Sequence, residues 1–239
     1  MTQKYLSDTE LYFAQPGNKT VDKIMLLDEE VHHITKVMRH NEGDKIYITT
    51  GEGKIWLCEI AGIEKKKALC LIEETLEYKN DFTGFTFCLP VMKSNDRLEF
   101  ALEKLVELGI TNFIIYSPGK GSSRAPRLDR LEKIAIAAMK QSLRAFRPEI
   151  NIFNSLEELF NTKGEKIVFD QKSDKTFSEY VKNSMEKNSG YYLIIGPEAG
   201  FSENEYKLFT NVTKLKLTDN RLRTETAAVV VGTVIATIF

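Results

Sequence analysis

Hydrophobic and polar positions follow two different rhythms along the chain, and the change lies near residue 77. Before it, the hydrophobic positions form short runs rich in β-branched and aromatic residues, which are typical of β-strands. The runs are KIMLL (23–27), KIYITT (45–50), KIWLCEI (54–60) and KALCLIEE (67–74). The segments EGD and GEG separate the middle runs as turns would. We therefore expect a small β-barrel domain over residues 1–76.

One stretch inside this region, EEVHHITKVMR, has helical spacing instead. Its hydrophobic residues recur every three to four positions and form an apolar stripe. The stripe consists of Val31, Ile34, Val37 and Met38. Asp28 precedes the stretch and has the side chain of a helix N-cap. The pattern predicts one helix between the first two strands, capped by Asp28.

From residue 85 on, predicted strands alternate with predicted helices. The strands are FTFCLPVM (85–92), TNFIIYS (111–117), KIVFD (166–170), YYLIIG (191–196) and KLKL (214–217). The helices are NDRLEFALEKLVEL (95–108), capped by Asn95 and stopped by Gly109, LDRLEKIAIAAMKQSLRAF (128–146), and a terminal helix from about Thr224. Such alternation is typical of an α/β fold with a mostly parallel sheet. The polar linker EYKNDFTG (77–84) marks the boundary, so the second domain is expected over residues 77–239.

Composition is that of an ordinary soluble protein and disfavours several classes. The 239 residues are 42% hydrophobic and 28% charged, with a formal net charge of −1. The three cysteines lack metal-binding spacing, so we expect no metal and reduced thiols in a cytoplasmic protein. No signal-peptide pattern and no membrane-spanning apolar run is visible. The absence of GxGxxG and GxxxxGK[ST] disfavours dinucleotide and nucleoside triphosphate binding, and the absence of GxSxG and HExxH disfavours two hydrolase classes.

Two segments of the second domain have the chemistry of ligand-binding loops. In the first, the strand YYLIIG runs into GPEAG (196–200), and Ser202 with Glu205 forms a capping-box pattern for the next helix. Two glycines around a tight turn let backbone amides approach a ligand, at the strand end where α/β folds bind ligands. An ordinary strand-to-helix turn explains this segment, taken alone, about equally well.

The second segment is KLKLTDNRLRTETAAVVV (214–231). Thr224 has the side chain of an N-cap for a helix that is apolar almost all round, which predicts burial in the core or in a subunit interface. Arg223 and Glu225 lie at the start of this helix, beside the expected ligand site. The helix dipole favours anions there and does not explain the arginine. A surface ion pair between Arg223 and Glu225 is the alternative.

Positive charge is concentrated in residues 117–147, which have an excess of six positive charges in a chain of net charge −1. Arginine binds phosphate through two nitrogen atoms at once, which favours an RNA-binding surface over a merely solvated helix face. The residues expected to face RNA lie in the loop GKGSSRAPR and in the segment LRAFR. They are Lys120, Arg124, Arg127, Arg144 and Arg147.

Five motifs, taken in order, resemble those of the ribosomal RNA small subunit methyltransferase E family. They are VMRHNEGDKI, KSNDRLEFALEKLVELGI, MKQSLRAFRP, IIGPEAGFSENEY and LRTETAA, of which the last two are the most specific. Members of this family use S-adenosylmethionine to methylate N3 of a uridine in 16S ribosomal RNA, and they belong to the SPOUT superfamily. The resemblance implies a PUA-like, RNA-binding β-barrel domain over residues 1–76 and a knotted methyltransferase domain over residues 77–239. It also implies 16S ribosomal RNA or the small ribosomal subunit as the partner, and a homodimer.

The resemblance assigns site residues through these motifs. The expected cofactor contacts are Ile195, Gly196, Pro197, Glu198, Gly200, Leu217, Leu222 and Thr224. Arg39 and Lys93 join the residues expected to bind RNA. The chain departs from the family pattern at Ala199, where the family has glycine, and at Thr218 and Arg221, where it has glycine and isoleucine. For Arg221, a contact with RNA is the alternative.

The chemistry of this reaction suggests roles for four residues. Uridine N3 carries a proton near neutral pH, so the enzyme must remove it or stabilise the anion that is left. Glu198 and Glu225 are candidate bases, while Arg223 and Arg144 are candidates for stabilising charge on O2 or O4. We favour stabilisation by arginine. Two other functions stay open: a SPOUT methyltransferase acting on another RNA, such as transfer RNA or a ribose 2′-hydroxyl, and a non-catalytic RNA-binding protein.

Overall fold

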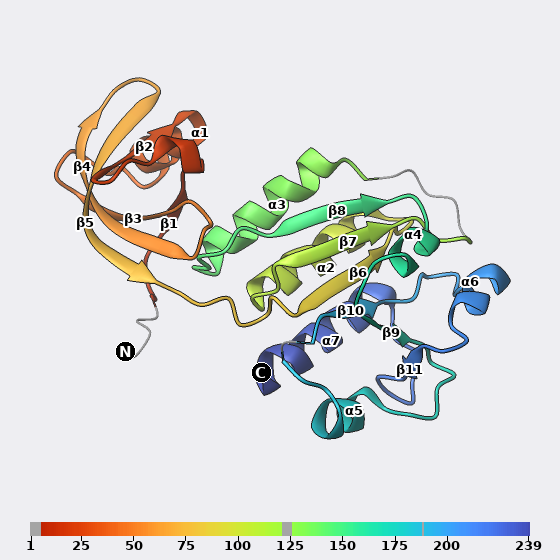
Figure 1. Cartoon of the computed structure of the whole chain (residues 1–239). Helices are drawn as coiled ribbons and strands as arrows, with labels where there is room; N and C mark the ends of the chain where they lie inside the picture. Colours follow the sequence, from red (N-terminus) through yellow and green to blue (C-terminus); the bar gives the residue numbers. More distant parts are fainter. Residues whose placement is uncertain (1–5, 121–125, 188) are drawn as a thin grey trace. The chain divides into compact units, whose positions relative to one another are not determined.

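The computed structural model describes residues 6–120, 126–187 and 189–239, and the chain divides into two compact units (Figure 1). The N-terminal unit comprises residues 1–80 together with residues 136–147. The α/β unit comprises residues 81–135 and 148–239. No sequence pattern had indicated that residues 136–147 belong with the first unit. The boundary expected between residues 76 and 77 therefore describes only part of this division.

The N-terminal unit is built on one five-stranded sheet in the order β1-β3-β4-β5-β2. Its strands are β1 (Leu11–Phe13), β2 (Lys23–Leu27), β3 (Lys45–Thr49), β4 (Lys54–Ile63) and β5 (Lys67–Glu77). All neighbouring strands are antiparallel except β1 and β3, which are parallel. The four predicted strands are present, and the short β1 was not predicted.

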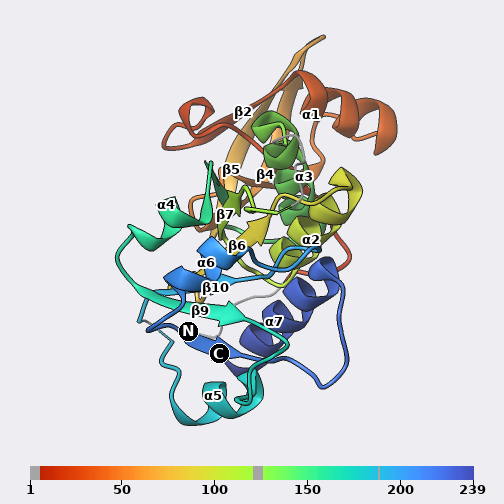
Figure 2. The same ribbon diagram turned by 90° about the vertical axis from the view of Figure 1, so that its right-hand side faces the viewer.

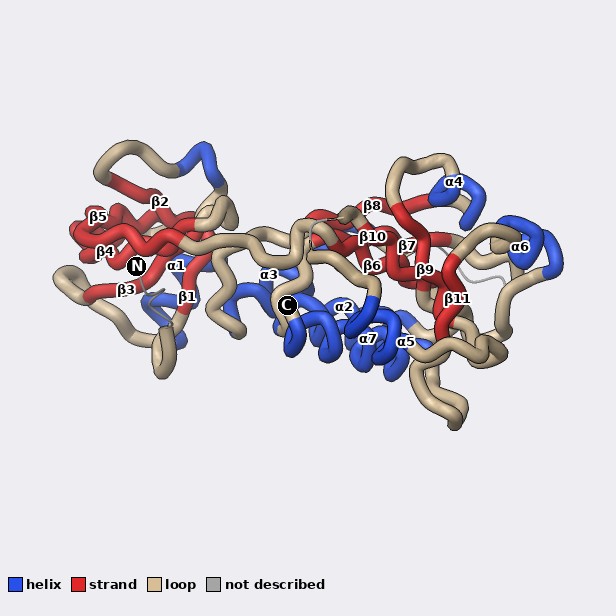
Figure 3. Tube along the Cα trace, turned by 60° about the horizontal axis from the view of Figure 1, so that its bottom comes forward, coloured by secondary structure: helices blue, strands red, loops and turns tan. Residues whose placement is uncertain are grey.

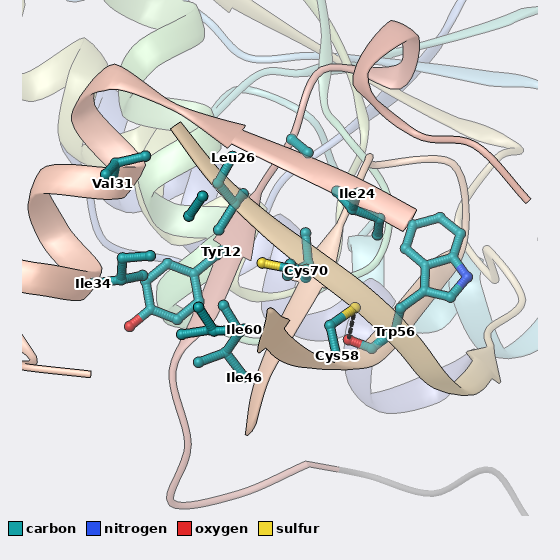
Figure 4. Packing of buried hydrophobic residues seen from close by; sticks show 13 residues of the cluster. Tyr12, Ile24, Leu26, Val31, Ile34, Ile46, Trp56, Cys58, Ile60 and Cys70 are labelled. Atoms are coloured by element: carbon teal, nitrogen blue, oxygen red, sulfur yellow. Dashed lines mark hydrogen bonds between the residues drawn. The ribbon is translucent and has the colours of Figure 1, made fainter. Parts of the chain in front are cut away.

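Side chains alternate across these strands, and one set packs into a single core (Figure 4). In β2, for example, Ile24 and Leu26 are fully buried while Lys23 and Leu27 are exposed. Figure 4 shows the inward-pointing side chains of several strands meeting around the ring of Tyr12, which comes from β1. The inner face of the sheet is thus formed by alternate residues of the predicted runs.

The helix between β2 and β3 differs from its prediction in two ways. α1 (Asp28–His32) has Leu27 as its N-cap with no side-chain hydrogen bond, so the expectation that Asp28 caps the helix was wrong. The Asp28 backbone N–H instead donates to the Lys66 carbonyl at 3.1 Å, beside the β2–β5 pairing. The chain then continues as a π-helix (His33–Val37), whose wider turn breaks the expected stripe and leaves Val37 58% exposed.

Residues 145–147 are held against the turn between β3 and β4 of the same unit. The Arg147 N–H donates to the Gly51 carbonyl, and the Gly53 N–H donates to the Ala145 carbonyl, each at 2.9 Å. Gly51 has a φ of +79°, and a Cβ atom there would lie 2.5 Å from the Arg147 Cβ. This close backbone pairing explains why the predicted helix 128–146 ends early, as α3 (Leu128–Gln141).

The α/β unit contains a fully parallel six-stranded sheet in the order β11-β9-β10-β6-β7-β8 (Figure 1). The strands are β6 (Phe85–Pro90), β7 (Asn112–Tyr116), β8 (Glu149–Phe153), β9 (Glu165–Phe169), β10 (Tyr191–Ile194) and β11 (Thr213–Leu215). Five of them were predicted, and β8 was not. The strand order reverses beside β6, and ligands of open α/β sheets bind where the order reverses.

Helices cover both faces of this sheet (Figure 3). They are α2 (Asn95–Glu107), α4 (Leu156–Phe160), α5 (Phe177–Asn183), α6 (Glu203–Leu208) and α7 (Thr224–Ile238), besides the first part of α3. α2 and α7 lie side by side on one face (Figure 2). α4 and α6 lie on the other face, where the ring of Phe160 in α4 contacts that of Phe209, the C-cap of α6. Both faces are therefore buried, as the hydrophobic strands require.

The helix ends test the capping predictions individually. The capping box of Ser202 and Glu205 at the start of α6 is confirmed, and Gly109, with a φ of +100°, follows the end of α2 as expected. Asn95 was wrong as a cap, because Ser94 holds that position without a side-chain hydrogen bond. Thr224 was also wrong as a cap, because its hydroxyl is used elsewhere, as described below.

Candidate functional site

A cleft of about 900 Å³ opens at the carboxyl ends of β9, β10 and β11 in the α/β unit. The start of α7 closes it on another side. The lining consists of residues 169–172, 196–201, 215, 217, 221–224 and 227, with Arg97, Lys120 and Tyr206. Adjacent parallel strands end at the same edge of a sheet, so the loops that follow them meet in space.

The loop of residues 196–200 forms one wall of this cleft. The Gly200 N–H donates to the Pro197 carbonyl at 2.9 Å, and Gly200 adopts a φ of +71°, so the loop turns tightly. The Thr224 hydroxyl donates to the Gly196 carbonyl at 3.1 Å, and Thr224 is 6% exposed. This hydrogen bond ties the two segments singled out in the sequence, which are 28 residues apart.

Glu198, at the middle of the loop, has both carboxylate oxygens occupied. Arg97 Nη1 donates to Oε1 at 2.7 Å, and the Lys93 backbone N–H donates to Oε2 at 3.1 Å. The Glu198 side chain is 20% exposed. Arg221 Nη2 also donates to the Glu198 backbone carbonyl, at 3.4 Å. The loop is thus fastened to the start of α2 and to the segment before α7.

Glu225, on the first turn of α7, lies behind the cleft and not on its surface. Its Oε1 atom is 3.7 Å from Arg97 Nε and 4.0 Å from Arg223 Nη1. The residue is 8% exposed, and Oε2 has no hydrogen-bond partner among the residues that the structure describes. Of the three side chains Arg97, Arg223 and Glu225, the two arginines are therefore exposed and the glutamate is buried.

Two buried residues, Tyr116 and Glu205, hold the loops around the cleft in place through hydrogen bonds. The Tyr116 hydroxyl, at the end of β7, donates to the Ile195 carbonyl at 2.7 Å, and burial raises the pKa of this phenol well above its usual value. Glu205 accepts from the Ser202 and Gly119 backbone N–H groups at 2.6 and 2.9 Å. These bonds join the ends of β7 and β10 and the start of α6.

The wall of the cleft that follows β9 combines polar, charged and aromatic side chains. The Gln171 amide donates to the carbonyls of Thr218 and Asp219 at 2.9 and 3.0 Å, which shapes the turn before α7. Tyr206 is 37% exposed, and Lys172 Nζ lies 5.9 Å from its ring centre. Partial burial, with the neighbouring Asp170 carboxylate, raises the pKa of Tyr206.

The lining carries more positive than negative charge. Asp170 and Glu198 are its carboxylates, against five cations. The cations are Arg97, Lys120, Lys172, Arg221 and Arg223. An excess of cations around a cleft attracts anionic groups such as phosphates.

The structure brings together most of the residues predicted to bind the cofactor. Seven of the eight line the cleft: Gly196, Pro197, Glu198, Gly200, Leu217, Leu222 and Thr224. The eighth, Ile195, is fully buried and is not part of the lining. Of the catalytic candidates, Arg223 and Glu198 line the cleft, Glu225 lies behind it, and Arg144 belongs to the N-terminal unit.

The residues predicted to bind RNA are more dispersed. Lys120 lines the cleft, Lys93 is exposed next to α2, and Arg127 is exposed and pairs with Asp129. The others that the structure describes belong to the N-terminal unit: Arg39, Arg144 and Arg147. Arg39 is exposed with a φ of +60°, directly after the π-helix. Arg124 lies outside the described residues.

Sequence reasoning missed several lining residues. Arg97 was inside a recognised motif but was not assigned a role, and its spacing gave no signal beyond that of an exposed helix position. Asp170 ends the predicted strand KIVFD (166–170) and residues 171–172 follow it, so the rule that ligands bind at strand ends indicates all three. Tyr206 shows no such signal, because only the fold places α6 beside this edge.

Comparisons with known proteins agree with this fold. A family model for an RNA methyltransferase domain matches residues 82–236, and a model for an RNA methyltransferase PUA domain matches residues 26–73. Ribosomal RNA small subunit methyltransferase E of Aquifex aeolicus is 31% identical, with 86% of this chain and 90% of that protein covered. The Bacillus subtilis protein of that name is 29% identical, with 90% and 91% covered.

Among solved structures, the protein of the same name from Neisseria gonorrhoeae, bound to S-adenosylmethionine, superimposes with a TM-score of 0.84. That match has 24% identity and covers 97% of this chain and 98% of the other. The N-terminal unit is therefore PUA-like, and the whole chain has the architecture of its relatives. Within the described residues, no helix is long and apolar enough to cross a membrane.

Proposed function

Because the chain belongs to the ribosomal RNA small subunit methyltransferase E family, we propose that it transfers a methyl group from S-adenosylmethionine to N3 of a uridine in 16S ribosomal RNA. The observation that carries this proposal is the joining of the loop 196–200 to the start of α7 by the hydrogen bond from Thr224 to Gly196. The two most specific motifs of the sequence thereby form one cleft at the ends of three adjacent parallel strands.

The residues of the cleft fit S-adenosylmethionine in size and chemistry. A volume of about 900 Å³ lies within the range of cofactor sites, which is roughly 300–1,000 Å³. A Cβ atom at Gly196 would lie 3.3 Å from Phe201 and 3.5 Å from the Phe169 carbonyl, so a larger residue there would require the Phe201 ring to shift by a few tenths of an ångström. Leu217 and Leu222 supply apolar surface for an adenine ring, and the loop backbones supply polar groups for its edge.

The bound cofactor supplies an electrophilic methyl group, and the protein's residues must hold the uracil ring in line with it. N3 must lose its proton to solvent before it attacks the methyl group, and the negative charge that this leaves on O2 and O4 must be stabilised until the N3–methyl bond forms and the S–methyl bond breaks, which releases S-adenosylhomocysteine. Arg223 lines the cleft and carries a permanent positive charge suited to this task. Glu198 is a poor base because both of its oxygens already accept hydrogen bonds. This arrangement supports stabilisation by arginine, the mechanism that the sequence favoured.

RNA recognition involves the N-terminal unit as well, in this proposal. The PUA-like domain holds the ribosomal RNA, with Arg39 and the segment of Arg144 and Arg147 as its basic contacts. Lys93, Lys120, Arg124 and Arg127 form the contacts of the second domain. The excess of cations in the cleft lining supports entry of the RNA backbone there.

The same proposal includes a homodimer that acts on 16S ribosomal RNA in the cytoplasm, and a trefoil knot in the α/β unit. The apolar helix α7 leaves Val229, Val230 and Val234 only partly buried and Ile238 48% exposed, and this group of apolar side chains supports a partner surface. β10 lies between β6 and β9 although both precede it in the chain, which supports a path that threads late segments between early ones.

Transfer of a labelled methyl group tests the activity. The protein is incubated with methyl-labelled S-adenosylmethionine and small ribosomal subunits that lack the modification. We expect label in 16S ribosomal RNA, and a loss of turnover of about 100-fold or more for Arg223→Ala with cofactor affinity nearly unchanged. Unchanged turnover in this variant would contradict the role of Arg223. Absence of label from the RNA with the wild-type protein would contradict the function itself.

A further inference from the structure

Arg97 links three elements of the α/β unit through one guanidinium group. It is the third residue of α2, its side chain is 40% exposed, and it lines the cleft. Nη1 lies 2.7 Å from Glu198 in the loop after β10, and Nε lies 3.7 Å from Glu225 on α7. A contact at each of two carboxylates uses the planar, multi-donor geometry that arginine has and lysine lacks.

The carboxylate of Glu198 is fixed from the same end of α2 at its second oxygen. There the Lys93 backbone N–H donates at 3.1 Å, just before the helix begins. The positive end of the α2 dipole adds to the attraction between this end and the carboxylate. The loop 196–200 therefore depends on α2 for its position at its central residue.

We propose that Arg97 is a positioning residue for the methyl transfer, which holds the cofactor-binding loop in place through Glu198 and shares its charge with Glu225. The inference rests on the proposed function and deepens it. It makes Glu198 an anchor of the loop and not a proton acceptor. The loop's other ties, from Thr224 to the Gly196 carbonyl and from Arg221 to the Glu198 carbonyl, hold only its backbone.

Loss of the Arg97 guanidinium would remove the cation that pairs with Glu198 and the nearer of the two cations beside Glu225. Glu198 would then turn toward water, because a partly buried carboxylate without its counter-ion is costly. The loop would move with it, and its backbone groups would no longer face the cofactor in one fixed arrangement. Cofactor affinity should therefore fall, while the unit stays folded, because Arg97 does not enter its core and Arg223 Nη1 still lies 4.0 Å from Glu225.

Arg97→Met tests this, with Arg130→Met as the matched control. Arg130 belongs to the same unit and pairs with Glu99 at 2.6 Å, but it does not line the cleft. Isothermal calorimetry with S-adenosylmethionine alone, without RNA, measures the affinity, and thermal unfolding of the same samples measures the fold. We expect Kd to rise about tenfold or more for Arg97→Met and by less than twofold for Arg130→Met, with both variants still folded at the assay temperature. Arg97→Lys should recover part of the lost affinity.

A second variant covers the case in which Arg97→Met fails to fold. Glu198→Gln removes the same ion pair from the loop side and should weaken cofactor binding to a similar degree. The double variant should be no weaker than Arg97→Met alone, because the Arg97–Glu198 pair that Glu198→Gln removes is already lost in that variant. Cofactor affinity in folded Arg97→Met or in Glu198→Gln within twofold of the wild type would overturn the proposal. If the wild-type protein itself does not bind S-adenosylmethionine, the proposed function fails, which is a different result.

Discussion

Replacing Tyr116 with phenylalanine removes one hydroxyl group from the interior of the α/β unit and keeps the ring. That hydroxyl donates to the Ile195 carbonyl at 2.7 Å, and Tyr116 is fully buried. A buried carbonyl that loses its donor costs about 1–3 kcal/mol of stability. For a unit of this size, such a loss lowers Tm by roughly 2–12 °C. The tie between the ends of β7 and β10 is lost with it, so cofactor affinity should fall as well.

Urea unfolding followed by circular dichroism, with and without S-adenosylmethionine, measures both effects. Tyr180→Phe is the matched control, because its hydroxyl bonds to Glu165 at 2.6 Å near the surface, where water replaces the lost partner. We expect the control to cost less than about 1 kcal/mol. Equal losses in the two variants would refute the reasoning that the Tyr116 hydroxyl supports the cleft from the core.

Four further predictions concern two substitutions and the buried cysteine thiols. Thr224→Val removes the donor to the Gly196 carbonyl and should weaken S-adenosylmethionine binding in calorimetry about three- to tenfold. Gly51→Ala should destabilise the N-terminal unit by about 1–3 kcal/mol in urea unfolding, because its φ is +79° and its Cβ would lie 2.5 Å from the Arg147 Cβ; Gly62→Ala, with open space around it, should cost much less. The three cysteines are buried, so an alkylating reagent at pH 8 should modify none in the native protein and all three in denaturant. Burial raises the pKa of two of these thiols from 9.0 to about 12, so the unfolded chain ionises first and the free energy of unfolding should fall as pH rises above 9.

Local patterns in the sequence predicted the elements well where one face of a strand or helix is buried. β2 to β5 followed from short β-branched runs, and the capping box at Ser202 located α6. Two similar capping patterns were not recognised in the sequence. Ser155 with Glu158 begins α4, and Thr176 with Glu179 begins α5, yet neither of these short helices was predicted. Local chemistry was present there, but helices this short have little periodicity to detect.

Contacts between distant segments were beyond the sequence patterns. Thr224 has the side chain of a cap, but the fold brings the Gly196 carbonyl beside it and its hydroxyl bonds there. Arg97 acquires its role only when α2 lies next to the loop after β10. The pairing of residues 145–147 with the turn at Gly51 likewise forms only when the fold brings these two distant segments together. Motifs identified the cofactor loops, whereas the residues that hold those loops in place required the structure.

Nucleoside analysis of 16S ribosomal RNA tests the central claim most directly. Small subunits without the modification are incubated with the protein and methyl-labelled S-adenosylmethionine, the RNA is digested to nucleosides, and the labelled product is identified by chromatography and mass spectrometry. Methylation at N3 predicts that the label appears as 3-methyluridine. Label in a 2′-O-methylated nucleoside or in another base would contradict the claim.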